Sequence, residues 1–69
     1  SEKAESEEPD IIEVLMGMRQ ELVACQIRRD EYYLLNDEKG YRKEVARISE
    51  LAREIGEISA AYENGGPVD

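Results

Sequence analysis

The chain has 69 residues and a formal net charge of −8. A chain this short allows one small domain at most, and the core of such a domain rarely contributes more than about 3–5 kcal/mol of net stability. The acidic balance disfavours nonspecific attraction to nucleic acid or to an anionic membrane. A single cysteine excludes an intrachain disulfide, and the lack of histidine removes one of the two usual structural zinc ligands, so we expect the fold to need a partner.

Residues 1–9 are expected to be a disordered acidic leader, because they contain almost nothing that a core could bury. A helix start follows, since Asp10 can cap the first turn and Glu13 stands three positions on, as in a capping box. The chain shows neither a signal-peptide pattern nor an apolar run near the roughly 20 residues of a membrane span. We therefore expect a cytoplasmic protein without membrane contact.

The first predicted helix, about residues 10–35, has two apolar stripes. The first, called the seam here, follows alternating steps of four and three residues, with Arg29 at its one missing place. Its members are Ile11, Leu15, Met18, Leu22, Cys25 and Tyr32. The second, called the outer stripe, lies about a third of a turn away. Its members are Ile12, Met16, Val23, Ile27 and Leu34, with Arg19, Gln26 and Asp30 in or between the two stripes. The opposite side of the helix is polar and includes Glu21 and Arg28.

The chain is expected to turn at about residues 36–40. If the first helix continued straight, its seam would have to bury Asn36, Lys39 and Lys43, which do not suit a core. Asn36, Asp37 and Gly40 are instead typical of turns and helix ends. Gly40 either lies in the first turn of the second helix or ends the connection.

The second predicted helix, about residues 38–63, has a single apolar stripe and ends before a frayed tail at 64–69. Its predicted contributions to the hairpin core are Val45, Ile48, Leu51, Ile55, Ile58 and Tyr62. Ion pairs between Arg47 and Glu50 and between Arg53 and Glu57 are expected on its exposed side.

The predicted fold is therefore all-α: an antiparallel two-helix hairpin that dimerises into a four-helix bundle. A monomeric hairpin would leave the outer stripe in water, which a second copy or a larger protein partner would prevent. The predicted partner interface consists of Ile12, Met16, Arg19, Val23, Ile27 and Leu34. Arg19 and Arg29 either reach to solvent, pair across the bundle with Glu44 or another carboxylate, or fix register and partner choice.

No catalytic, cofactor or metal site is predicted. Cys25 lies on the seam, where a cysteine acts as a small hydrophobic side chain, and no histidine can serve as its base. The segment NDEKG lacks the flanking acidic residues of a calcium-binding EF-hand loop. The expected function is therefore non-catalytic protein–protein interaction or oligomerisation through apolar helix faces.

Two alternative functions stay open beside this one. In the first, the chain is the oligomerisation tail of a nucleic-acid-handling protein; in the second, it is a small acidic inhibitor of a nucleic-acid-binding protein. Six cations lie near the turn, but interleaved carboxylates predict a salt-bridged surface there rather than a phosphate-binding one. These cations are Arg28, Arg29, Lys39, Arg42, Lys43 and Arg47. Residues 41–59, YRKEVARISELAREIGEIS, resemble the oligomerising helices of some phage small terminase subunits. The resemblance rests on arginine, glutamate and leucine spacing that many coiled-coil segments share.

Overall fold

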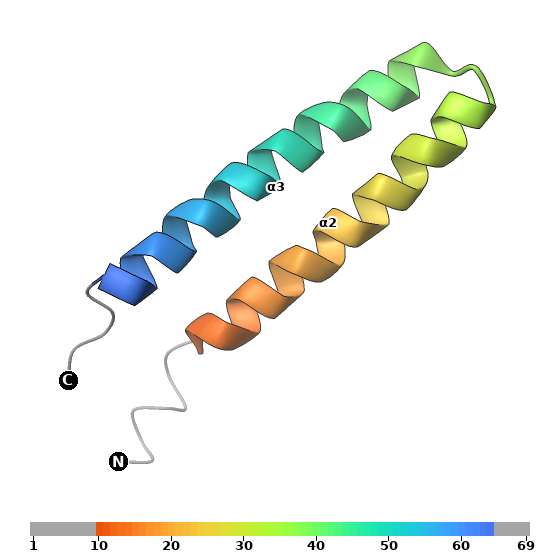
Figure 1. Ribbon diagram of the computed structural model, residues 1–69. Helices are drawn as coiled ribbons and strands as arrows, with labels where there is room; N and C mark the ends of the chain where they lie inside the picture. The colour runs from red at the N-terminus through yellow and green to blue at the C-terminus, as the bar shows by residue number, and fades with distance from the viewer. Residues whose placement is uncertain (1–9, 65–69) are drawn as a thin grey trace.

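The computed structural model describes residues 10–64 as two α-helices, α2 (Ile11–Leu34) and α3 (Glu38–Asn64), packed as an antiparallel hairpin (Figure 1). The prediction of an all-α hairpin is confirmed. α2 is one residue shorter at each end than expected, and α3 is one residue longer, so Asn64 belongs to the helix and not to the tail. The predicted leader at 1–9 and residues 65–69 of the predicted tail lie outside the described residues.

α2 begins where the sequence pattern predicts a cap. Asp10 has an extended backbone, and its Oδ1 accepts a hydrogen bond from the Ile12 backbone N–H at 3.0 Å. This bond satisfies one of the N–H groups that a helix start leaves without an internal partner. Glu13 lies in the first turn, where a negative charge is favoured by the helix dipole.

The connection between the helices is short because two caps follow each other directly. α2 ends in a Schellman motif: the Asn36 N–H donates to the Tyr33 carbonyl at 3.1 Å, and the Asp37 N–H donates to the Tyr32 carbonyl at 2.9 Å. Asn36 has a φ of 59°, the left-handed conformation that this motif requires. Asp37 then caps α3, since its Oδ1 accepts from the Gly40 N–H at 3.0 Å.

Gly40 lies in the first turn of α3, directly against the ring of Tyr32 from α2. A Cβ atom at position 40 would lie 2.7 Å from Cγ of that ring, much closer than van der Waals contact allows. Rotation of the ring about its Cβ–Cγ bond leaves Cγ in place, so the overlap is removed only if the whole Tyr32 side chain or the backbone shifts. The glycine is therefore needed for the close approach of the two helices at the turn.

We expect Gly40→Ala to lower the free energy of unfolding by about 1–3 kcal/mol, as overpacking typically does. Gly56→Ala is the matched control, because a Cβ atom there meets nothing within 4 Å. Alanine loses less backbone entropy than glycine when a helix forms, so that variant should be more stable by roughly 0.5–1 kcal/mol. Urea unfolding followed by circular dichroism measures both changes, and a Gly40→Ala variant as stable as Gly56→Ala would contradict the packing argument.

The buried core of the described residues is small. Its hydrophobic members are Leu15 and Cys25 from α2 and Leu51 from α3, of which Leu51 is 1% exposed and Cys25 0% exposed. A ring of half-buried side chains surrounds them, namely Ile11, Val14, Met18, Leu22, Tyr32, Ile48, Ile55 and Ile58. The hairpin is a single layer, with extents of 52 × 23 × 12 Å, so each helix is covered on one side only.

The structure places two residues of the predicted core outside it. Val45 is 37% exposed, because Glu44, one heptad before Leu51, occupies the position that faces α2. Tyr62 is 44% exposed. Since Arg28 faces Glu44 and Glu21 faces Arg47, Tyr62 lies level with the start of α2 or beyond it, past the part of α2 that the structure describes.

Candidate interaction surface

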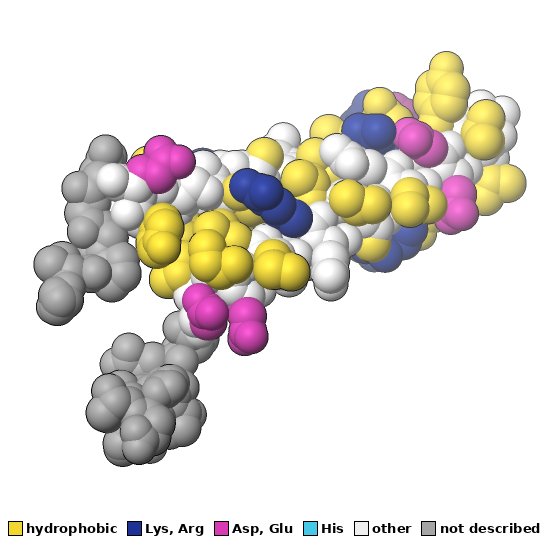
Figure 2. Space-filling view, turned by 60° about the horizontal axis from the view of Figure 1, so that its bottom comes forward, with side chains coloured by type: hydrophobic (Ala, Val, Ile, Leu, Met, Phe, Trp, Pro, Cys, Tyr) yellow, Lys and Arg dark blue, Asp and Glu magenta, His cyan; other side chains and the backbone are white. Residues whose placement is uncertain are grey.

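The outer stripe of α2 is exposed along its whole length. Its five hydrophobic side chains range from 46% exposed at Ile12 to 79% exposed at Leu34. Figure 2 shows one face of the hairpin, on which hydrophobic side chains gather with single charged side chains among them. At about 100° per residue these positions fall on one side of α2, well away from the seam that faces α3. The single hairpin therefore leaves a row of large aliphatic side chains in water, an arrangement that marks interaction sites.

Two opposite charges belong to this same side of α2. Arg19 is exposed, and the structure gives it no ion pair or hydrogen bond to another side chain within residues 10–64. Asp30 has a side chain that is 68% exposed, and its Oδ1 accepts from Nε of Arg29 at 3.0 Å. The partner of Arg29 is thus its neighbour on the same helix, and within residues 10–64 the structure gives Arg29 no contact across the hairpin to Glu44 or another carboxylate.

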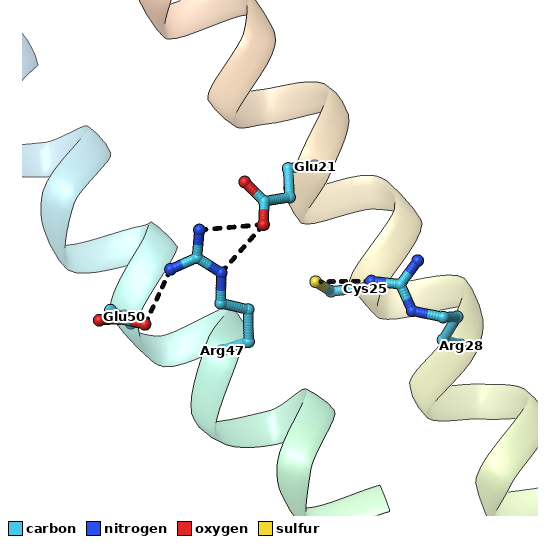
Figure 3. Close-up of polar contacts among 5 residues, drawn as sticks. All are labelled: Glu21, Cys25, Arg28, Arg47 and Glu50. Atoms are coloured by element: carbon cyan, nitrogen blue, oxygen red, sulfur yellow. Dashed lines mark hydrogen bonds and ion pairs between the residues drawn. The ribbon is translucent and has the colours of Figure 1, made fainter. Parts of the chain in front are cut away.

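The flank of the seam opposite the outer stripe is polar and links the two helices. Arg47 of α3 contacts Glu21 of α2 at 2.9 Å from Nη2 and Glu50 of its own helix at 2.8 Å from Nη1 (Figure 3). The hydrogen bond to Glu50 helps to raise the pKa of Arg47. The predicted pairs Arg47–Glu50 and Arg53–Glu57 are both present, the latter at 3.6 Å.

Glu44 is the charged side chain that the described part of the chain buries, with only 4% of its surface exposed. Nε of Arg28 donates to its Oε2 at 3.2 Å, and Nη2 of the same guanidinium donates to Sγ of Cys25 at 3.4 Å. Hydrogen bonding to Arg28 lowers the pKa of Glu44. Burial, with the nearby Glu44 carboxylate, raises the pKa of the Cys25 thiol, so Cys25 is a protonated core group.

The sequence pattern assigned Glu21 and Arg28 to the outward polar side of α2, but both contact α3. Their positions flank the seam, and long arginine side chains span the remaining distance between the helices. The burial of Glu44 could be predicted from the heptad spacing of the second helix. Steps of four and three through Leu51, Ile55, Ile58 and Tyr62 lead back through Ile48 to position 44, not to position 45.

The cations near the turn are mostly neutralised. Four of the six that the sequence groups there form ion pairs: Arg28 with Glu44, Arg29 with Asp30, Arg42 with Glu38, and Arg47 with Glu21 and Glu50. The predicted salt-bridged surface is confirmed for Arg29, Arg42 and Arg47, whereas Arg28 pairs with the buried Glu44. Since phosphate binding requires unpaired positive charge, this end of the hairpin does not favour a nucleic-acid interface.

A shallow hollow of about 360 Å³ lies beside the turn, where the rings of Tyr33 and Tyr41 stand 6.0 Å apart between centroids. Its remaining lining residues are Tyr32, Asn36, Asp37 and Glu38. Within residues 10–64 no three His, Cys, Asp or Glu side chains are grouped so that they could hold a metal ion. Neither described helix is long and apolar enough to cross a membrane.

Searches of protein-family models, curated proteins and solved structures find no match to this chain.

Proposed function

We propose that this chain is a non-catalytic protein–protein interaction module that self-associates through the outer stripe of α2 into a dimeric four-helix bundle. The observation that carries the proposal is the exposure of Ile12, Met16, Val23, Ile27 and Leu34 on one side of a helix whose seam already contacts α3. Burial of aliphatic surface is the main favourable term in protein association.

A second copy is the partner that best fits the hairpin. The described residues bury only three hydrophobic side chains, which is a small core for a free-standing domain. A second hairpin presents the same stripe, so two copies cover each other's apolar surface at once. The helices, of 24 and 27 residues, are matched closely enough in length to pack side by side as a bundle.

The non-catalytic part of the proposal rests on the state of the ionisable groups. Cys25 is buried and its pKa is raised, which disfavours the thiolate that would act as a nucleophile. Glu44, the buried carboxylate, has a lowered pKa and contacts Arg28, so it is a structural anion and not a proton donor near neutral pH.

The proposal predicts that Ile27→Asp weakens self-association about tenfold or more, because it places a charge in an apolar contact. Ala46→Asp is the matched control: it introduces the same charge at an exposed position of α3 outside the stripe. Sedimentation velocity at equal concentrations compares the two variants with the unmodified chain. Equal dimer fractions in all three proteins would contradict an interface built on the outer stripe.

A further inference from the structure

Arg19 and Asp30 give the outer stripe a direction. They are eleven positions apart on α2, which corresponds to about three turns plus about 20° and to a rise of about 16 Å. Both therefore lie on the side of the helix that carries the exposed hydrophobic residues. Asp30 contacts Arg29 through one oxygen and remains 68% exposed, so it can accept a bond from a second cation.

Given the proposed self-association, on which this inference rests, we propose that the two copies pair α2 against α2 in antiparallel orientation. Arg19 of each copy then contacts Asp30 of the other. The two-fold axis passes through the contact at the level between residues 24 and 25, midway along α2 between the two charges. A two-fold interface brings the same patch of both subunits together, so it forms this ion pair twice.

The charges disfavour a parallel arrangement of the two α2 helices in register. In that arrangement Arg19 would face Arg19 and Asp30 would face Asp30, and like charges close together in an interface are unfavourable. The antiparallel arrangement instead gives each exposed charge an opposite partner. A stripe that carries one cation and one anion at equal distances from its middle is thus complementary to itself.

The hydrophobic residues match in the same register. Around an axis at residues 24 and 25, Val23 lies within one residue of level with Ile27 of the second copy, and Met16 does so with Leu34. These contacts would bury aliphatic side chains against each other.

The alternative antiparallel register, centred on Val23, is unfavourable at both charges. It would place Arg19 opposite Ile27 and Met16 opposite Asp30, which sets each charge against an aliphatic side chain. The positions of the charges and of the hydrophobic residues therefore select the same register.

Charge reversal tests this register directly. Arg19→Glu and Asp30→Arg should each weaken dimer formation about tenfold or more, because each places like charges at both symmetry-related contacts. The double variant Arg19→Glu/Asp30→Arg should restore it. An equimolar mixture of the two single variants should form mainly the mixed dimer, in which every contact again joins opposite charges. Native mass spectrometry distinguishes the mixed dimer from both homodimers.

Glu31→Arg is the control for the single variants, since it reverses an exposed charge adjacent to the stripe and should leave dimer formation unchanged. If a single variant loses helix because it no longer dimerises, the mixture and the double variant must recover that helix. Failure of both rescues, or single variants that dimerise normally, would overturn the register. A monomeric unmodified chain would instead overturn the proposed self-association itself.

Discussion

Leu51→Ala is expected to leave the chain largely unfolded in mild denaturant, because Leu51 is the most completely buried side chain of α3, at 1% exposure. Truncation of a buried leucine to alanine costs about 2–5 kcal/mol through lost burial and the cavity left behind. A chain of this length has only about 3–5 kcal/mol of net stability from its own core. One substitution is therefore comparable to the whole folding free energy.

Urea titration at one fixed protein concentration, followed by circular dichroism, measures this loss, since association makes stability depend on concentration. Leu35→Ala is the matched control, because it removes the same atoms from a side chain that is 74% exposed. We expect a change within about 0.5 kcal/mol there. Similar transition midpoints for the two variants would show that the contact between α2 and α3 does not hold the hairpin together.

Arg28→Ala is expected to destabilise the hairpin at neutral pH and to change its response to acid. Arg28 is the ion-pair partner of Glu44, and its removal leaves that buried carboxylate without the charge that stabilises it. Arg42→Ala is the control, because Arg42 and Glu38 are both exposed and such pairs contribute little. The loss of stability should therefore be clearly larger for Arg28→Ala than for Arg42→Ala.

The pH dependence follows from the lowered pKa of Glu44. A carboxylate whose pKa is lower in the folded state stabilises the fold fully above its unfolded pKa, which is about 4.3 for glutamate. That contribution is lost as the pH falls through the lower folded-state pKa. Between pH 6 and pH 3, the unmodified chain should thus lose more stability than Glu44→Gln. Parallel curves for these two proteins in thermal unfolding would contradict the ion-pair argument.

The helical hairpin could be predicted from the sequence because its apolar positions repeat with helical spacing and its polar turn residues interrupt them. Asp10 also acts as the cap that its position indicates. The detailed structure of the turn could not be predicted as well, because the left-handed conformation of Asn36 is set by hydrogen bonds to the last turn of α2. Composition indicates a turn there, but it does not define which residue adopts a positive φ.

The polar contacts between the helices were assigned less well. Hydrophobicity alone favours Val45 over Glu44 at a buried position, so the sequence predicts Val45 in the core and Glu44 only as a candidate ion-pair partner. The heptad spacing decides otherwise, and the burial of Glu44 is tolerated because Arg28 reaches it across the flank of the seam. Glu21 is equally hard to place from the sequence. A rotation of the helix by a fraction of a turn decides whether a charged side chain beside the seam points to solvent or reaches the other helix, as Glu21 does.

The proposed dimer joins two copies of this chain through the outer stripe of α2. Sedimentation equilibrium of the unmodified protein, over a range of concentrations from well below micromolar upward, tests it most directly. We expect a reversible equilibrium between monomer and dimer that reaches twice the mass of one chain and goes no further. A species that keeps the mass of a single chain at every concentration would rule out the proposed dimer.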